Sequence, residues 1–304
     1  MKVFVTGVGG QLGHDVMNEL AARGYEGVGS DIASAYAGIH DGTAVTTAPY
    51  MQLDITDGEA VERVLSEVRP DAVIHCAAWT AVDAAEEPAN AEKVRAVNAG
   101  GTAHIACACE RLGCKMMYIS TDYVFSGQGD APWQPDCEDY APLNVYGQTK
   151  LLGELAVKAH VARRFIVRIA WVFGLNGQNF IRTMLRLSET HDTLRVVSDQ
   201  IGTPTYTLDL ARLLCDMIGT EKYGCYHATN EGGYISWADF AKEIFRQAGK
   251  NVDVIPVTTA EYGLSKAARP YNSRLDKAKL TASGFEPLPD WRDAVARYIE
   301  AMGV

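Results

Sequence analysis

The first 31 residues constrain the fold of this chain more than any other stretch. A short apolar, β-rich run at Lys2–Thr6 is followed by a glycine loop at Gly7–Gly13 and then by apolar residues at helical spacing. A second β-rich run, Val28–Asp31, comes after the helix. Strand, glycine loop, helix and strand in this order form a βαβ unit, whose strands are parallel and whose crossover is right-handed.

The glycines of this loop predict a binding site for a dinucleotide. Gly7 permits the tight turn after the strand, Gly10 lets the backbone approach a pyrophosphate, and Gly13 lets the helix pack closely on the sheet. The helix N-terminus favours the negative charge of the phosphates. The alternative is a glycine-rich turn without a ligand, which the strand–helix context disfavours.

Asp31, at the end of the second predicted strand, bears on the choice of dinucleotide. An acid at this place accepts hydrogen bonds from the adenosine ribose hydroxyls. The sequence has no Lys or Arg between Arg23 and Arg63, and so offers no cation there for a 2′-phosphate. We therefore expect NADH or NADPH as the cofactor, with NADH favoured. A helix or turn cap is the alternative role for Asp31.

Predicted strands alternate with predicted helices along the first 171 residues, which is typical of a parallel sheet covered on both faces. We expect an α/β fold, a Rossmann-type doubly wound parallel sheet with a smaller C-terminal substrate-binding domain. The dinucleotide domain is expected at residues 1–171, with 205–230 returning to it. The substrate-binding region is expected at 172–204 and 231–304, without a marked linker.

A second motif lies between Ser120 and Lys150. Tyr146 and Lys150 fall one turn apart on one face of a predicted helix, where the ammonium is expected to lower the pKa of the phenol. Thr121 ends the predicted strand 115–120, and parallel strands place it at the same sheet edge as the glycine loop. These groups suit transfer of a hydride and a proton to a carbonyl. The alternative is an ordinary exposed aromatic and a solvated charge.

Further candidates follow other strands. Asp54 and Ile55, after the third strand, are placed to face an adenine, with a capping role for Asp54 or Thr56 as the alternative. Ala77 and Ala78 are small enough for a cofactor to lie against the backbone. Asn98, within a predicted helix that precedes a separate one at Ile105–Leu112, is either a polar support for the site or a surface residue. We assign no function to the loop 33–50.

Composition excludes several classes of function. The 304 residues carry a net charge of −10, which argues against nucleic acid and acidic membrane as partners. No run approaches the ~20 apolar residues of a membrane span, and the chain enters its first strand without a signal peptide. The seven scattered cysteines fit a reduced, cytoplasmic protein. Cys107 and Cys109 with Cys114 raise a metal site as an alternative to buried apolar packing, and their spacing favours packing.

Taken together, the chain resembles the extended short-chain dehydrogenase/reductase family, and within it the reductases that act on the C4 ketone of a dTDP-linked deoxysugar. The Tyr-x-x-x-Lys pair defines only the superfamily, whereas the combination of motifs is far more specific. The matching stretches span nearly the whole chain: TGVGGQLG (6–13), AAWTAVDAAE (77–86), STDYVFSG (120–127), PLNVYGQTK (142–150), RIAWVFG (168–174), DQIGTPT (199–205) and ARPYNSRLD (268–276).

The resemblance implies a role for each matching residue. Tyr146 would donate the proton, Lys150 would hold the nicotinamide ribose, and Thr121 would bind the substrate oxygen. Contacts to the sugar nucleotide, a small-molecule partner, are implied for Asp122, Tyr123 and Trp171. Arg274 is a further candidate, as a cation near the diphosphate, with an ordinary surface cation as the alternative. Contacts to the cofactor are implied for Gly10, Gln11, Leu12, Asp31, Asp54, Ile55, Ala78, Trp79 and Thr80.

The chain departs from the family pattern at several positions. His75 and Cys76 stand where Asn-Ala is usual, Trp79 stands where His is common, and the loop 33–50 is longer. Some members bridge a dimer through magnesium bound by acids of two helices. Here Asp15 is available but Leu208 stands where the second acid is wanted, which argues against magnesium and that dimer. A monomer or a homodimer is therefore expected.

Two other functions fit the same fold. An epimerase or dehydratase acting on a sugar nucleotide would keep its cofactor bound and return the hydride, whereas a reductase consumes NADH with each turnover. A regulatory homologue without activity would tend to lose the Tyr or the Lys, and both are present here with Thr121.

Overall fold

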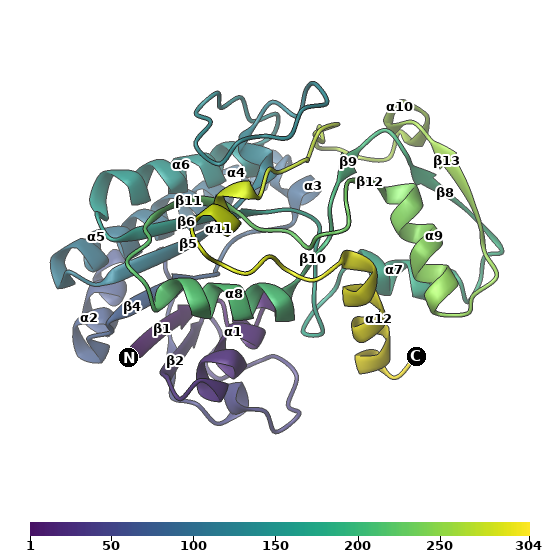
Figure 1. Cartoon of the computed structure of the whole chain (residues 1–304). Helices are drawn as coiled ribbons and strands as arrows, with labels where there is room; N and C mark the ends of the chain where they lie inside the picture. Colours follow the sequence, from purple (N-terminus) through teal and green to yellow (C-terminus); the bar gives the residue numbers. More distant parts are fainter.

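A seven-stranded sheet forms the centre of the computed structural model, which describes residues 1–304 (Figure 1). All its neighbouring strands are parallel, which confirms the predicted fold class. Across the sheet the order is β11 (Gly224–His227), β6 (Arg164–Ile169), β5 (Lys115–Thr121), β4 (Ala72–His75), β1 (Lys2–Thr6), β2 (Glu26–Asp31) and β3 (Tyr50–Gln52).

Helices cover both faces of this sheet because its side chains alternate between two cores. Val3 and Val5 face one core, which contains residues of helices α1 (Gln11–Ala22) and α8 (Thr207–Ile218). Phe4 faces the other, which contains residues of three further helices. These are α2 (Gly58–Val68), α5 (Thr102–Leu112) and α6 (Val145–His160). Burial on both faces explains why the strands are continuous apolar runs.

The helix around Asn98 differs from the sequence prediction. A short helix α3 (Val82–Ala85) and a 3₁₀ turn η2 (Pro88–Asn90) lead into one continuous helical run. That run comprises α4 (Ala91–Arg95), a π-helical segment η3 (Ala96–Gly101) and α5, where the sequence predicted two separate helices. A Cβ at Gly101 would lie 2.6 Å from the Ile55 side chain, so the π segment brings the helix close to the end of β3. Such single π turns often mark functional sites.

The remaining elements form a smaller unit beside the sheet, at the right of Figure 1. Its core is aromatic and includes Phe173, Phe240 and Trp291. Its helices are α7 (Phe180–Leu187), α9 (Trp237–Gln247), α10 (Thr259–Tyr262) and α12 (Trp291–Met302). Its strands pair two by two: β7 (Val172–Phe173) with β10 (Thr205–Tyr206), β9 (Ile201–Gly202) with β12 (Ile235–Ser236), and β8 (Thr193–Val197) with β13 (Asp253–Val257).

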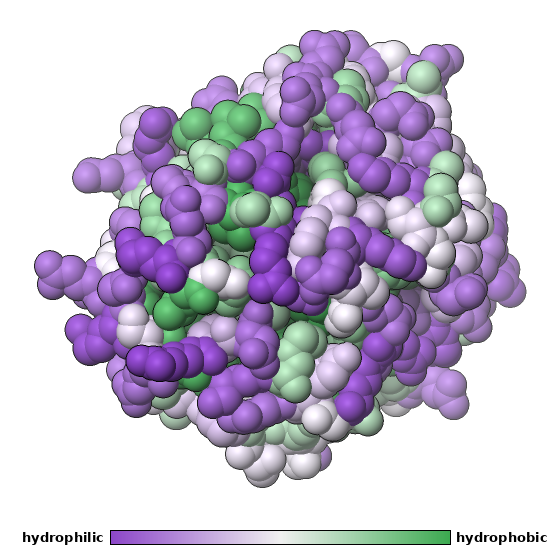
Figure 2. Space-filling view, turned by 60° about the vertical axis from the view of Figure 1, so that its left-hand side comes forward, coloured by the Kyte–Doolittle hydropathy of each residue, from purple (hydrophilic) through white to green (hydrophobic).

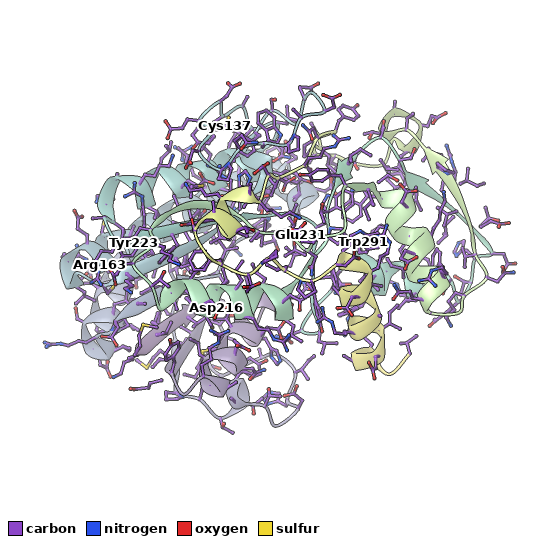
Figure 3. All side chains as sticks on the ribbon, in the orientation of Figure 1. Cys137, Arg163, Asp216, Tyr223, Glu231 and Trp291 are labelled. Atoms are coloured by element: carbon purple, nitrogen blue, oxygen red, sulfur yellow. The ribbon has the colours of Figure 1, made fainter.

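The chain crosses between the two units more than once. Helix α8 packs on α1, and β11 extends the sheet beside β6. Helix α11 (Ala278–Ala282) also packs on β11, and Leu280 and Phe285 join the core on the α1 face. Figure 3 shows Glu231 and Trp291 side by side where the chain enters α12, and the Trp291 amide donates to the Glu231 carbonyl at 2.8 Å. Below, residues 1–171 with 207–230 are called the sheet part, and 172–206 with 231–304 the outer part.

The outer surface is mostly polar. The face in Figure 2 is largely hydrophilic, and hydrophobic atoms show only in separate patches between polar side chains. None of the helices combines the length and the apolar character that crossing a membrane requires.

Candidate active site

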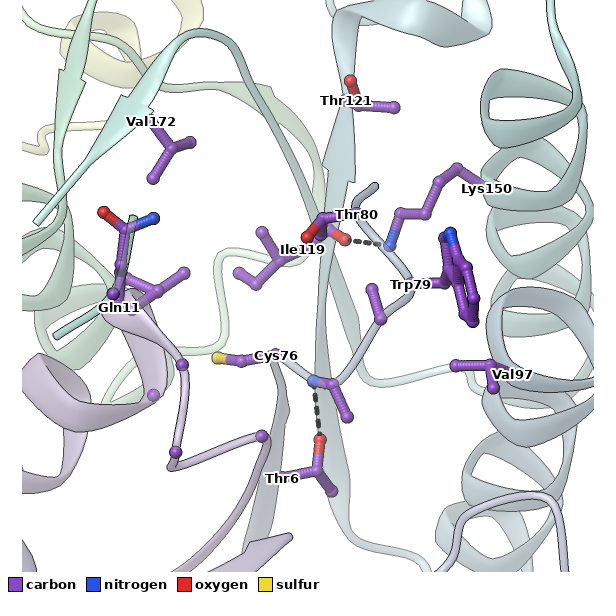
Figure 4. Close-up of a pocket in the computed structure, with 18 of the residues that line it drawn as sticks. Thr6, Gln11, Cys76, Trp79, Thr80, Val97, Ile119, Thr121, Lys150 and Val172 are labelled. Atoms are coloured by element: carbon purple, nitrogen blue, oxygen red, sulfur yellow. Dashed lines mark hydrogen bonds between the residues drawn. The ribbon is translucent and has the colours of Figure 1, made fainter. Parts of the chain in front are cut away.

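A cleft of about 810 Å³ opens at the carboxyl ends of the parallel strands, where ligands bind in doubly wound sheets. Figure 4 shows part of its lining, with residues of the glycine loop on one side and of α6 on the other. Nearly all residues predicted from the sequence line it: Gly7, Gly10, Gln11, Leu12, Gly13, Asp31, Asp54, Ile55, Ala77, Ala78, Trp79, Thr80, Thr121, Asp122, Tyr123, Tyr146, Lys150 and Trp171. Asn98 and Arg274 do not.

The glycine loop has the geometry that its sequence predicts. Gly7 has φ +73°, and a Cβ there would lie 2.7 Å from the Ala77 backbone nitrogen. A Cβ at Gly13 would collide with the carbonyl oxygen of Gly7. Strand end, loop and helix therefore approach one another at backbone distance, and α1 begins at Gln11 with its free amides facing the cleft.

Asp31 takes the capping role considered for it and also lies at the cleft. Its carboxylate accepts hydrogen bonds from the amides of Gly9 (2.9 Å) and Ile32 (2.8 Å), so it caps the local backbone. It also lines the cleft. The lining contains no Arg, and Lys150 is its only Lys. The part of the cleft beside β2 thus presents a carboxylate without an Arg.

The predicted capping role after β3 belongs to another acid. Asp57 is the N-cap of α2 and accepts from the Ala60 amide at 3.0 Å. Asp54 instead closes a turn by accepting from the amide and hydroxyl of Thr56. Because the short side chain of Asp57 reaches the N3 amide directly, it takes the cap, and Asp54 stays at the cleft.

Tyr146 lies in the first turn of α6, facing the end of β5. Asn144 caps this helix by accepting from the Gly147 amide at 2.8 Å. The Thr121 hydroxyl donates to Asp122 at 3.0 Å. The structure therefore brings the predicted phenol and alcohol together in the lining of one cleft.

The predicted effect of Lys150 on Tyr146 is not what the structure shows. Burial raises the pKa of the Tyr146 phenol well above its usual value, a bond from Thr121 opposes this, and Asp122 adds to it. The Lys150 ammonium donates to the Ile119 carbonyl at 2.7 Å, as Figure 4 shows. The prediction was wrong because it counted the charge and not the burial of the phenol. A phenol held protonated suits a proton donor.

Lys150 is itself strongly affected by burial. Burial lowers the pKa of its ammonium to about 7, and the Glu154 carboxylate opposes this shift. Glu154 lies one further turn along α6 and is fully buried. It accepts from the Ser120 hydroxyl at 2.5 Å and from two guanidinium nitrogens of Arg168 at 2.8 and 2.7 Å. Sequence analysis missed the ion pair of Glu154 with Arg168. The i, i+4 spacing of Glu154 from Lys150 could have drawn attention to Glu154.

Asn98 supports the cleft from behind its wall. Its side chain accepts from the Trp79 amide at 2.7 Å and donates to the Trp79 carbonyl at 3.1 Å. His75 supports the next strand end: it bonds the hydroxyls of Thr6 (2.7 Å) and Thr102 (3.1 Å). Of the two roles considered, Asn98 therefore takes that of a polar support.

The loop 33–50 also contributes indirectly, through Asn176. The Asn176 amide nitrogen donates to the carbonyls of Gly9 (3.0 Å) and Gly10 (3.3 Å), and its oxygen accepts from the Ile39 amide at 2.9 Å. Tyr36, from the same loop, bonds His14 on α1 at 2.6 Å. Asn176 thus ties the glycine loop, this long loop and the outer part together, a role that no local sequence pattern indicates.

Two predicted substrate contacts behave differently. Trp171 lines the cleft and has a left-handed backbone, with φ +50°. Arg274 bonds Asn272 at 3.0 Å and lies outside the cleft lining. Arg269, in the same irregular segment, pairs with Asp83 at 2.7 Å instead, which the sequence did not reveal.

The residues that would bind metal have other partners. All seven cysteines are free, and no group of three or more His, Cys, Asp or Glu side chains is arranged for a metal ion. The buried Asp15 accepts from the Thr207 hydroxyl at 2.5 Å. Asp209 accepts from both terminal nitrogens of Arg297, at 2.9 and 2.7 Å. These carboxylates do not fit a magnesium site, since Arg297 already supplies the positive charge.

Comparisons with known proteins bear on the whole chain. Residues 1–304 match the family described as the RmlD substrate binding domain. The dTDP-4-dehydrorhamnose reductase of Streptomyces griseus is 41% identical over 98% of this chain and 93% of its own length. The crystal structure of such a reductase from Clostridium acetobutylicum superposes with a TM-score of 0.90 and 38% identity, covering 100% of both chains. One from Bacillus anthracis, in complex with NADP, gives a TM-score of 0.88 and 38% identity over 99% of each chain.

Proposed function

Because the chain belongs to the family of the dTDP-4-dehydrorhamnose reductases, we propose that it reduces the C4 ketone of dTDP-4-dehydro-L-rhamnose to give dTDP-L-rhamnose. The cofactor is a nicotinamide dinucleotide. The observation that carries this proposal is the meeting of Tyr146, Thr121 and Lys150 with the glycine loop in one cleft. The enzyme is then an oxidoreductase of nucleotide-sugar biosynthesis.

The cleft fits a dinucleotide at the glycine loop. The absent side chains of Gly7 and Gly13 leave backbone amides at the start of α1 open to a pyrophosphate. We assign Asp31 to the adenosine ribose and Lys150 to the nicotinamide ribose, because both side chains line the cleft. The nicotinamide supplies the hydride when it is bound.

The side chains of the cleft donate the proton and bind the oxygen that accepts it. Tyr146, kept protonated by burial, donates its proton to the C4 oxygen as that oxygen gains negative charge. Thr121 holds the same oxygen by a hydrogen bond and fixes its distance from the phenol. The Lys150 ammonium supplies a positive charge for the nicotinamide ribose. Asp122, Tyr123 and Trp171 line the part of the cleft that remains for the sugar.

We favour NADH over NADPH. A 2′-phosphate on the adenosine ribose would meet the Asp31 carboxylate, and the cleft lining offers no Arg there. A related structure contains NADP, so the two cofactors should be compared directly. Higher kcat/KM for NADH would support this preference, and higher kcat/KM for NADPH would contradict it.

The decisive experiment follows the absorbance of added NADH with enzymatically made dTDP-4-dehydro-L-rhamnose. We expect one NADH consumed for each dTDP-L-rhamnose formed. An epimerase or dehydratase would change the sugar without consuming NADH. Binding of NADH without turnover of any 4-keto sugar nucleotide would point to a regulatory homologue.

Assembly and location are part of the same proposal. We propose a cytoplasmic monomer or homodimer, because the seven unpaired cysteines suit a reducing compartment and Arg297 neutralises the acid that a bridging metal would need. Light scattering with and without a chelator tests this: a dimer that dissociates on metal removal would contradict it.

A further inference from the structure

The backbone at Trp171 is strained where the cleft meets the outer part. Trp171 has φ +50°, a conformation that large side chains rarely adopt. Such strain persists only where the surrounding structure enforces it, and it concentrates at functional sites. Trp171 follows β6 directly and lines the cleft with Thr121 and Tyr146.

Strands of the outer part hold this backbone in place. The Trp171 carbonyl accepts from the Thr205 amide at 3.1 Å. The hydroxyl of Thr205 donates to the Ala170 carbonyl at 2.6 Å, and this threonine is fully buried. Gly202 leaves room for the indole, because a Cβ there would lie 2.9 Å from it. Strands β9 and β10 therefore fix the position of the Trp171 backbone, from which the indole extends.

The plane of the indole is fixed by a second tryptophan. Trp171 and Trp237 stack with ring centroids 3.8 Å apart and an angle of 16° between the rings. Trp237 is the first residue of α9, and Ser236 anchors this helix start with a capping box. Ser236 also pairs with Ile201 between β12 and β9, so both tryptophans rest on the same strand pair. Trp237 itself does not line the cleft.

We propose that Trp237 is a positioning residue, which holds the Trp171 indole as a flat wall for the apolar C–H face of the deoxysugar. This inference rests on the proposed function, since it assigns the sugar to that side of the cleft. One face of the Trp171 ring is covered by Trp237, and Trp171 contributes to the cleft surface. Aromatic faces of fixed orientation give ligand sites their shape. Without Trp237 the indole would lose the contact that sets its plane.

The kinetic test compares Trp237→Leu and Trp237→Phe with Phe180→Leu. The ring centroids of Phe180 and Trp237 lie 4.7 Å apart in the same aromatic cluster, and Phe180 has no ring contact with Trp171. Trp237→Leu should raise the KM for the sugar nucleotide about three- to tenfold, with Trp237→Phe between it and the native protein. The KM for NADH should stay unchanged in all variants. Phe180→Leu should leave both KM values near native.

A spectroscopic readout separates orientation from general stability. Two stacked indoles give a paired positive and negative band in circular dichroism, which should vanish in Trp237→Leu and in Trp171→Phe and remain in Phe180→Leu. Adding dTDP-L-rhamnose, the product, should change this signal in the native protein. The same titration gives a product Kd, which Trp237→Leu should weaken by the same three- to tenfold factor.

Different results overturn different claims. Equal effects of Trp237→Leu and Phe180→Leu on the sugar KM would reduce Trp237 to general packing and overturn the inference. A product Kd unchanged in Trp237→Leu would do the same, even if the enzyme showed no turnover. Absence of NADH consumption by the native protein would instead remove the proposed function, while the paired band would still report on the stack.

Discussion

The sheet part and the outer part both contribute residues to the cleft, but they differ in secondary structure and in the side chains of their cores. The sheet part rests on seven parallel strands with largely aliphatic cores on both faces. The outer part has strand pairs, most of only two residues, around an aromatic core. Ladders of backbone hydrogen bonds therefore fix the sheet part. The outer part depends on ring stacking, on Asn176 and on ion pairs that reach between the parts.

Because of this difference, we expect mutations in the two parts to have effects of different size. Changes to the reacting groups on the sheet part should abolish turnover, and changes to its glycine loop should weaken cofactor binding. Changes to the contacts of the outer part should shift substrate binding or local stability by smaller amounts. Each prediction below tests one step of that gradient.

The largest effect is expected for Tyr146→Phe, which removes only the hydroxyl. Loss of a general acid typically lowers the rate ~10²–10⁴-fold, and kcat should fall by that factor while the Kd for NADH stays unchanged. Tyr234→Phe is the matched control, because its hydroxyl bonds the Leu275 carbonyl in the outer part, away from the cleft. A loss below tenfold, with chemistry limiting the rate, would remove Tyr146 as the proton donor.

Gly13→Ala should have the second largest effect. The added methyl would collide with the Gly7 carbonyl oxygen, a backbone atom that cannot swing aside as a flexible side chain could. Overpacking of this kind costs about 1–3 kcal/mol, so NADH should bind roughly ten- to a hundredfold more weakly in a fluorescence titration. Gly100→Ala, where the nearest atom lies 4.0 Å away, is the control and should bind NADH normally. Equal binding by both variants would show that the loop tolerates displacement.

The same difference explains what the sequence could predict. The glycine loop, the strands beside it and helix α6 carry local signals: turn glycines, continuous apolar runs and the Tyr-x-x-x-Lys spacing. These predicted almost completely which residues of the sheet part line the cleft. Asn98 also had a local signal, since an asparagine in a helix interior usually serves a polar partner.

The remainder depends on partners far apart in the chain. Trp171 meets Trp237, Arg269 meets Asp83, and Asn176 reaches the glycine loop, and no periodicity links such pairs. The two-residue strands are too short for an alternation pattern to appear. The pKa of Tyr146 was mispredicted for a related reason, because burial is a property of the folded chain and not of local spacing.

The pKa of Lys150 predicts how kcat/KM for NADH depends on pH. Burial lowers its pKa to about 7, so the ammonium is present below that pH and is lost as the pH rises above it. We expect kcat/KM for NADH to fall about tenfold per pH unit above about 7. Neighbouring groups titrate elsewhere, because the pKa is about 3 for His75, about 12 for Cys76 and about 6 for Asp122.

Lys150→Arg provides the control for this assignment. A guanidinium stays charged over the whole range, so the variant should be slower overall but should lose the decline above pH 7. An unchanged decline in Lys150→Arg would assign it to a different group. A profile that instead rises through pH 7 would contradict the need for a charged ammonium.

The smallest effect is expected for the ion pair between Asp83 and Arg269, which links helix α3 to the segment after α10. Asp83 accepts from Arg269 and from the amides of Lys266 and Ala267, and its pKa is lowered to about 2, chiefly by the Arg269 hydrogen bond. A carboxylate with a lowered pKa stabilises the fold above its ordinary pKa, and that stabilisation is lost as the pH falls toward 2. Both side chains are partly exposed, so Arg269→Gln should lower the unfolding free energy by no more than about 1 kcal/mol at neutral pH.

The local consequence of Arg269→Gln should exceed the global one. Proteolysis should cut faster between Leu264 and Arg269, while kcat and NADH affinity stay native, because neither Asp83 nor Arg269 lines the cleft. Lys242→Gln, which removes an exposed charge pair within α9, is the control and should leave the cleavage rate unchanged. A loss of NADH binding in Arg269→Gln would mean that the two sides of the cleft are coupled more tightly than their separate architectures imply.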